Sequence, residues 1–273
     1  GKVLVGIDMK SAQLSIAAYY ANNWSYYNAV ASGRELDPDN DDAYIGESSH
    51  CVNARMFGLV SDEDWKEAIL NQQHDLLKKI GLMRKKSKAG SFLVIFGGAG
   101  DLLAVKMGIP KSEGSAKKES FMREMGLDKV NKHMKDVLQK KYPRAGGWYL
   151  PIGMGYWVWN NSPHKNLNSV VQGAEALCQK LAVVRASGEV RKAGLGDRAI
   201  KILDVHDEML WECDPDIADE VGRIVCEAYT WAAQVWHNDH VRNPHWFAGP
   251  TVPTWSIDLD GGYKIGPNYY AVH

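Results

Sequence analysis

Two aspartates that lie about two hundred residues apart each stand where an apolar strand is expected to end. Asp8 closes the apolar segment 2–8, and Asp207 follows the apolar segment 199–205. Hard divalent cations such as Mg²⁺ prefer carboxylate oxygens and take few protein ligands. Two such ions, roughly 4 Å apart, can activate an attacking hydroxyl oxygen and hold a triphosphate. If the fold brings the two strand ends together, these carboxylates could hold two metal ions.

The neighbours of these aspartates offer further ligands. The Met9 backbone carbonyl could bind one ion, and Glu208 could support the site or bind an ion directly. Each position also has a simpler interpretation, because Asp8 suits a strand end or a helix cap and residues 206–208 suit a solvated hairpin turn. Taken singly, the simpler interpretations are better, so the metal site depends on the rest of the chain.

A basic helix is expected between the two aspartates. Arg84, Lys88 and Phe92 recur every four residues, so on a helix they share one face. The two cations could neutralise the β- and γ-phosphates of a nucleoside triphosphate, and Lys88 could act in catalysis by stabilising charge on the departing pyrophosphate. Phe92 would offer a flat face to the base and sugar. The alternative is an amphipathic helix with a basic outer face and with Phe92 and Phe96 in the core.

A second pair at helical spacing is polar. Asn168 and Gln172 lie within the helix expected over 166–187 and share one of its faces. Both side chains can donate hydrogen bonds to the minor-groove acceptors that every correct base pair displays. By themselves they are equally compatible with the polar edge of an ordinary helix.

The distribution of charge indicates a polyanionic partner. The formal net charge is −1 over 273 residues, yet residues 78–144 contain 17 Lys or Arg against 6 Asp or Glu. Such a basic segment favours phosphates as ligands, with an affinity that falls steeply with salt. Because lysine is normally exposed, only Arg84 and Lys88 have a spacing that indicates more than a solvated surface.

Several classes of protein are excluded. No apolar run approaches the roughly 20 residues of a membrane helix, so we expect a soluble protein with no membrane partner. The acidic run 35–42 fails as a calcium loop, because Asp42 stands where glycine is required and Ser48 where a bidentate Glu is required. We interpret this run as a solvated loop. Four scattered cysteines without zinc-ligand spacing are expected to be reduced thiols: Cys51, Cys178, Cys213 and Cys226.

An α+β fold is expected to position these residues, since strands are indicated at both ends of the chain with helices between and behind them. The expected strands cover 2–8, 199–205 and 209–213, the last two as a hairpin, with a further hairpin over 148–159. Residues 14–20 are either the start of a helix or a continuation of the apolar layer. Further helices are expected over 51–59, 63–80, 82–96, 166–187 and 214–236. Residues 97–100 end the basic helix, residues 110–145 are helical in part, and residues 252–273 form short strands and turns.

The order of these motifs resembles the family A DNA polymerases, the bacterial polymerase I type and its phage relatives. Motifs A, B and C of that family are matched, in order, by four features of this sequence: a strand that ends in Asp, then Arg-x3-Lys-x3-Phe-x3-Phe-Gly, then Asn-x3-Gln, and finally Val-His-Asp-Glu. Residues 84–97 fall in the family register without a gap. The closing segment 265–273 is similar to the end of the phage replicative members, which implies a natural C-terminus. The resemblance covers nearly the whole chain.

The resemblance implies template-directed DNA synthesis, in which a two-metal site transfers a nucleotide from a dNTP to a primer 3′-hydroxyl. Two Mg²⁺ ions, for which Mn²⁺ could substitute, would bind at Asp8 and Asp207. The implied organisation is a polymerase palm sheet over 1–20 and 168–273, with largely helical fingers inserted over 21–167.

Further roles follow from the same resemblance. Arg84 and Lys88 would grip the triphosphate on a fingers helix that closes over a correct nucleotide. Phe92 matches a position that influences acceptance of nucleotides lacking a 3′-hydroxyl, and as Phe it implies discrimination against them. Contacts with the primer-template DNA would come from Asn168, Gln172 and His206.

The chain departs from the family pattern beside the sugar of the incoming nucleotide. Gln13 stands where the family usually has a Glu that excludes a ribose 2′-hydroxyl, and Phe96 replaces the Tyr that typically hydrogen-bonds that Glu. Because both partners are replaced together, no buried carboxylate is expected to lose its donor. We expect Gln13 to block the 2′-hydroxyl sterically, with reduced stringency. Ser15, where members usually have Arg, has no interpretation.

The family's thumb, first palm segment and proofreading exonuclease have no counterpart here, because the resemblance begins at motif A. We therefore expect one subunit of a split polymerase, or an excised fragment, that needs a second polypeptide for full activity. The expected location is the cytoplasm of a bacterium or of a phage-infected host cell.

Two alternatives stay open. The chain could be a relative of the single-subunit RNA polymerases, or a catalytically silent DNA-binding or assembly module. Residues 205–208 and the Asn-x3-Gln pair favour the DNA enzyme. Retention of both aspartates together with Arg84 and Lys88 argues against a silent module.

Overall fold

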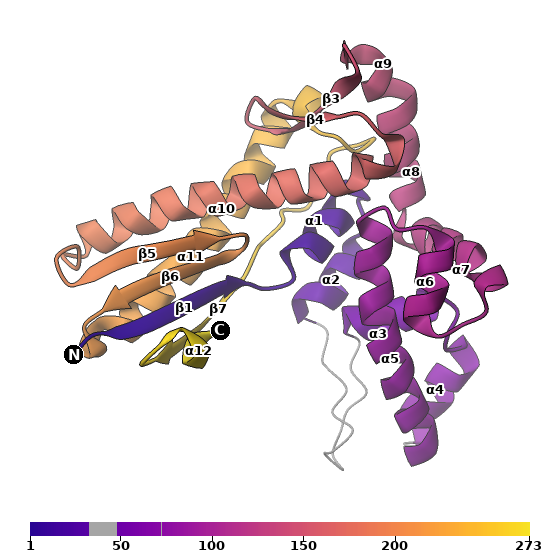
Figure 1. Ribbon diagram of the computed structural model, residues 1–273, viewed down its shortest axis with the longest axis horizontal. Coiled ribbons are helices and arrows are strands. Elements are labelled where there is room, and N and C mark those ends of the chain that lie inside the picture. The colour runs from indigo at the N-terminus through magenta and orange to yellow at the C-terminus, as the bar shows by residue number, and fades with distance from the viewer. Residues whose placement is uncertain (33–47, 72) are drawn as a thin grey trace.

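The computed structural model describes residues 1–32, 48–71 and 73–273, so the acidic run 35–42 lies outside the described residues. Figure 1 shows a sheet with long helices at one side and a mainly helical part at the other. The α+β prediction is thereby confirmed. Two short helices, α1 (Ala12–Tyr20) and α2 (Trp24–Ser32), lead from the sheet to the helical part.

An antiparallel four-stranded sheet has the order β5-β6-β1-β7. The first strand, β1, is interior because it pairs with β6 from Val3↔Cys213 to Asp8↔Glu208 and with β7 on its other side. Side chains alternate along a strand, so Val5, Ile7 and Met9 are buried on one face while Asp8 lies on the other. The strands are β1 (Val3–Met9), β5 (Ala199–Val205), β6 (Glu208–Cys213) and β7 (Gly261–Gly266).

Two long helices cover the apolar face of the sheet. The second of them, α11 (Ala218–Arg242), packs against β1 and β7, and α10 (Asn166–Lys192) packs against α11 (Figure 1). A short helix, α12 (Tyr269–Val272), lies against β1 at Gly6, where a Cβ atom would stand 2.8 Å from the Val272 carbonyl oxygen. Glycine at this position therefore lets α12 approach the strand that carries Asp8.

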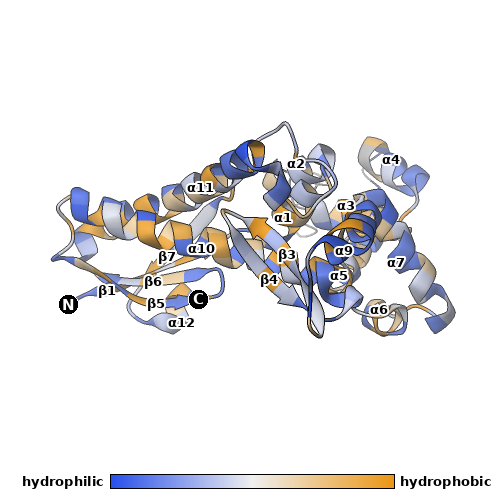
Figure 2. Ribbon diagram, turned by 90° about the horizontal axis from the view of Figure 1, so that it is seen from above, coloured by the Kyte–Doolittle hydropathy of each residue, from blue (hydrophilic) through white to orange (hydrophobic). Residues whose placement is uncertain are grey.

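The helical part is built from short helices around α5. Figure 2 shows hydrophilic residues gathered on α7 and α9, as the count of basic residues over 78–144 led us to expect. A π-helical turn, Met134–Leu138, joins α8 to α9. The helices are α3 (Ser49–Met56), α4 (Asp62–Asn71), α5 (His74–Ile95), α6 (Gly100–Met107), α7 (Lys111–Met125), α8 (Leu127–His133) and α9 (Gln139–Lys141).

A separate antiparallel sheet supports the N-terminal half of α10. It contains β2 (Pro143–Arg144), β3 (Gly147–Gly153) and β4 (Tyr156–Asn160), which confirms the expected hairpin. Gly173 of α10 lies so close that a Cβ atom there would stand 2.8 Å from Val158 Cγ1. This close packing holds the part of α10 that carries Asn168 and Gln172.

The helix boundaries differ from expectation in several places. The helices expected over 63–80 and 82–96 are divided instead between Asn71 and His74, and α5 continues through Gly81. Glycine inside a helix costs only about 1 kcal/mol, and Ile80 is buried with Trp65 in a small core, so tertiary packing decides this boundary. In addition, α3 ends at Met56 rather than at residue 59, and α10 ends at Lys192, five residues later than expected. The helix α11 begins at Ala218, after the turn Pro215–Ile217, and ends at Arg242 rather than at residue 236. The short helix α12 lies within the tail that was expected to hold strands and turns.

The four cysteines lie in the core or are half-exposed, as expected: Cys51, Cys178 and Cys213 are buried, and Cys226 is partly buried. Within the described ranges, we find no helix that combines the length and the apolar character needed to cross a bilayer.

Candidate active site

The two aspartates lie at the same end of neighbouring strands. The β5–β6 hairpin turns at 206–207, and β6 pairs with β1 so that Glu208 stands opposite Asp8. The Met9 backbone N–H donates a hydrogen bond of 3.1 Å to the Asp207 carbonyl oxygen. The fold therefore brings together two carboxylates that are remote in sequence.

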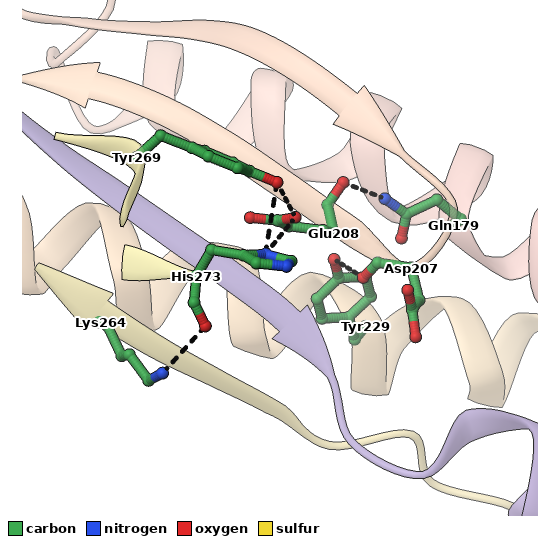
Figure 3. Close-up of polar contacts among 7 residues, drawn as sticks. All are labelled: Gln179, Asp207, Glu208, Tyr229, Lys264, Tyr269 and His273. Carbon is green, nitrogen blue, oxygen red and sulfur yellow. Dashed lines mark hydrogen bonds and ion pairs between the residues drawn. The ribbon is translucent and has the colours of Figure 1, made fainter. Parts of the chain in front are cut away.

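The turn that carries Asp207 is held from two sides. His206 adopts a positive φ of 52°, which tightens the hairpin, and its side chain is exposed. The Tyr229 hydroxyl, on α11, donates a hydrogen bond of 3.0 Å to the Asp207 carbonyl oxygen, as Figure 3 shows. With the bond from Met9, the backbone of Asp207 is fixed while its carboxylate stays available.

The electrostatics of this end of the sheet favour a bound cation. Burial raises the pKa of the Asp8 carboxyl, and the neighbouring carboxylates of Asp207 and Glu208 raise it further. Like charges held this close disfavour each other's ionised form unless a cation separates them. A cavity of about 420 Å³ opens here, lined among others by Asp8, Asp207, Glu208, Lys10, His206 and Lys264.

The donors fit Mg²⁺ better than a metal held entirely by protein. In the described part of the chain, no group of three or more His, Cys, Asp or Glu side chains is placed to enclose an ion. Magnesium commonly keeps several waters and binds through one or two carboxylates plus substrate phosphates. Asp8 and Asp207, with the Met9 carbonyl beside them, match that kind of site.

Glu208 has a different environment from the two aspartates. Its carboxylate oxygen Oε2 accepts a hydrogen bond of 3.1 Å from the Tyr269 hydroxyl and lies 3.1 Å from Nδ1 of His273 (Figure 3). Its backbone carbonyl accepts from Gln179 Nε2 on α10. Glu208 is therefore engaged with the C-terminal segment, which suits support of the site more than direct binding of an ion.

The basic helix α5 stands on the helical side, apart from the sheet (Figure 1). Lys88 is exposed and Arg84 is half-buried, whereas Ser87 is buried and donates from its hydroxyl to the His50 carbonyl oxygen. The single continuous helix confirms that Arg84, Lys88 and Phe92 occur at successive turns. The alternative interpretation is correct in part, since Phe92 packs against the core, but Phe96 is 37 % exposed.

The end of α5 depends on a glycine. Gly97 has a φ of 82°, and a Cβ atom there would collide with the carbonyl oxygen of His164. Both the backbone conformation and the close approach require glycine. The Phe-Gly pair 96–97 therefore fixes where α5 stops, directly beside the turn that precedes α10.

The α10 face predicted from Asn168 and Gln172 continues for one more turn. Gln172 is exposed, and among the described residues the buried Oδ1 atom of Asn168 has no hydrogen-bond donor. One turn beyond them lies Glu175, which accepts a hydrogen bond of 3.0 Å from Gln13 Nε2. Sequence analysis did not identify Glu175. Its i+3 spacing from Gln172 was the signal that could have indicated it.

Glu175 makes stability depend on pH. Burial is the main reason that the pKa of its carboxyl is raised to about 7, from a usual value of 4.5. The hydrogen bond from Gln13 acts in the opposite direction and lowers this pKa. The negative charges of Asp207 and Asp8 raise the pKa further, whereas the charge of His206 lowers it. The folded chain therefore holds a proton that the unfolded chain loses above pH 4.5, so the unfolding free energy falls as pH rises from about 4.5 to 7. The total change is at most about 3 kcal/mol.

Glu175→Gln removes this titration. We expect the variant to gain stability relative to the unaltered chain as the pH is raised from 5 to 8, measured by urea unfolding with a chelator present. A difference in unfolding free energy that stays constant over this range would contradict the assignment.

The comparisons with known proteins give the family to which this sheet and basic helical part belong. The family model described as DNA polymerase family A matches residues 69–241. The chain belongs to DNA polymerase family A, which confirms the resemblance.

Two relatives illustrate the extent of the match. DNA polymerase I of Aquifex aeolicus (strain VF5) is 23% identical over 241 residues, which cover 86% of this chain and 36% of that protein. The POL domain of Pol1 from M. smegmatis, solved in complex with DNA primer-template and dNTP, is similar in fold. Its TM-score is 0.62 at 19% identity, over 98% of this chain and 40% of that chain. The chain thus spans well under half the length of either relative.

Proposed function

We propose that this chain carries the catalytic site of a DNA-directed DNA polymerase, which transfers a nucleotide from a dNTP to the 3′-hydroxyl of a primer. The observation that carries the proposal is the convergence of Asp8 and Asp207 at one end of the sheet, with the Met9 N–H bonded to the Asp207 carbonyl oxygen. Membership of DNA polymerase family A supports the same reaction.

Asp8, Asp207 and the Met9 carbonyl would hold two Mg²⁺ ions, or Mn²⁺ in their place. When bound, the ions lower the pKa of the primer hydroxyl and neutralise the phosphates. Asp8 and Asp207 would fix the positions of these ions at the ends of the strands, while Glu208 keeps the strand end in place through Tyr269.

The remaining residues bind nucleotide and DNA. Arg84 and Lys88 neutralise the triphosphate, with Lys88 placed to stabilise the departing pyrophosphate, and Phe92 and Phe96 offer aromatic surface to the base and sugar. On α10 and at the hairpin turn, Asn168, Gln172 and His206 contact the primer-template. The expected division into palm, 1–20 and 168–273, and fingers, 21–167, accords with this use, although its second boundary falls inside α10.

Primer extension tests the proposal. The purified chain is mixed with Mg²⁺, a single dNTP and a labelled primer annealed to a longer template. Extension of the primer by one nucleotide is expected only with the dNTP that is complementary to the template. Synthesis from ribonucleoside triphosphates without a primer would favour the RNA polymerase alternative. Binding of the primer-template without any extension would favour the silent module.

The expectation of a second polypeptide that supplies the thumb stays a prediction, as do the phage relationship and the cytoplasmic location. A second polypeptide that grips the DNA is expected to increase the number of nucleotides added per binding event. Processive extension by the purified chain would contradict this expectation.

A further inference from the structure

Gln13 and Glu175 form a hydrogen-bonded pair beside the proposed catalytic site. Gln13 is the second residue of α1, which directly follows the strand that carries Asp8, and Glu175 lies on α10. The Gln13 Nε2 atom donates to Glu175 Oε2 over 3.0 Å. The pair therefore links the strand end of Asp8 to the helix face of Asn168 and Gln172.

Glu175 has no evident role in stabilising the fold. Its side chain is only 7 % exposed, and burying a carboxylate is costly unless a cation or several donors compensate. Among the described residues no cation pairs with it, and its Oε1 atom has no hydrogen-bond partner. The carboxylates of Asp207 and Asp8, whose charges act on Glu175, carry the same sign of charge. A carboxylate kept under these conditions is better explained by what it does to Gln13.

The hydrogen bond selects one orientation of the Gln13 amide. A glutamine side chain carries an acceptor oxygen and a donor NH₂ group that can exchange places by rotation. Glu175 Oε2 accepts from the Gln13 NH₂ group, so this contact turns the Gln13 oxygen away from Glu175. The half-buried Gln13 is then held in one position rather than sampling several rotamers.

We infer that Glu175 is a positioning residue that holds Gln13 against the sugar of the incoming nucleotide and so sets the discrimination between deoxyribose and ribose. This inference rests on the proposed polymerase function. The carboxylate that the family pattern would place at position 13 is supplied here by Glu175 of α10, which acts through Gln13.

A double-mutant cycle tests whether Glu175 acts through Gln13. Glu175→Met and Gln13→Met keep side-chain length while removing the hydrogen bond. The measured quantity is the ratio of kcat/KM for a dNTP to that for the matching rNTP on one primer-template. Glu175→Met is expected to lower this ratio about tenfold, roughly the effect of one hydrogen bond to a charged group. In the Gln13→Met background it is expected to change the ratio no further.

Two further variants separate positioning from folding. Glu175→Gln keeps an acceptor for the Gln13 NH₂ group and is expected to retain most of the selectivity, and Lys180→Ala, an exposed change on the same helix, is expected to leave the ratio unchanged. An unchanged ratio in Glu175→Met, or an equal effect in both backgrounds, would overturn the inference.

A readout that needs no catalysis distinguishes failure of this inference from failure of the proposed function. The side-chain NH₂ resonances of Gln13, identified by their loss in Gln13→Met, are expected to shift in Glu175→Met and much less in Glu175→Gln. If these resonances shift but the unaltered chain adds no dNTP, the polymerase proposal fails while the contact stands. If they do not shift, the positioning role is wrong whatever the activity.

Discussion

Replacing Asp8 or Asp207 with alanine is expected to reduce primer extension by at least about 1,000-fold, because each change removes a carboxylate that would hold a metal ion at the reacting phosphate. The structure places both side chains on one cavity beside the hairpin turn, so neither can substitute for the other. Primer-template binding is expected to change little, since neither aspartate is a cation that contacts DNA phosphates. Rapid-quench extension assays and fluorescence anisotropy measure the two effects separately.

A matched control is Asp101→Ala, which removes an exposed carboxylate at the start of α6. This variant is expected to retain extension. Asp8→Asn offers a second measurement: it relieves repulsion among Asp8, Asp207 and Glu208, so the chain without metal should melt at a higher temperature, and added Mg²⁺ should no longer stabilise it. Extension that persists in Asp8→Ala, or unaltered Mg²⁺ stabilisation in Asp8→Asn, would reject the metal assignment.

Replacing Arg84 or Lys88 with alanine is expected to lower kcat/KM for the incoming dNTP by about 100-fold, because each loses a charge-assisted contact with the triphosphate. Lys88→Ala is expected to act mainly on kcat, since its contact strengthens as charge develops on the departing pyrophosphate. Arg84→Lys should recover only part of the activity, because an ammonium cannot reproduce the planar fork of a guanidinium. Single-turnover extension over a range of dNTP concentrations separates these effects.

The control for the basic helix is Lys85→Ala, which removes an equal charge from an exposed position next to Arg84 on α5. If general attraction of DNA to the basic surface were the only contribution, Lys85→Ala and Lys88→Ala would have the same effect at every salt concentration. A dNTP dependence that is unchanged in Lys88→Ala would exclude its role at the triphosphate.

Much of the local structure could be predicted from sequence. Residues 199–213 form a hairpin whose two strands are neighbours in the sequence. Strand propensity and alternation were therefore enough to predict that Asp207 and Glu208 lie at its turn. The prediction that Arg84, Lys88 and Phe92 lie at successive turns required only that the helix be continuous. The division between α4 and α5 could not be predicted, because burial of Ile80 with Trp65 decides it.

The sequence by itself determined the residue types, their spacing and the family of the chain, because short-range periodicity and motif order are local properties. Only the tertiary structure decided that β1 lies between β6 and β7, which sets Asp8 opposite Glu208, and that α12 folds back to bind that glutamate. It also decided that Glu175 meets Gln13 across 162 positions of the chain. Such contacts depend on which faces of strands and helices are buried together, and that choice is made by the packing of the whole core.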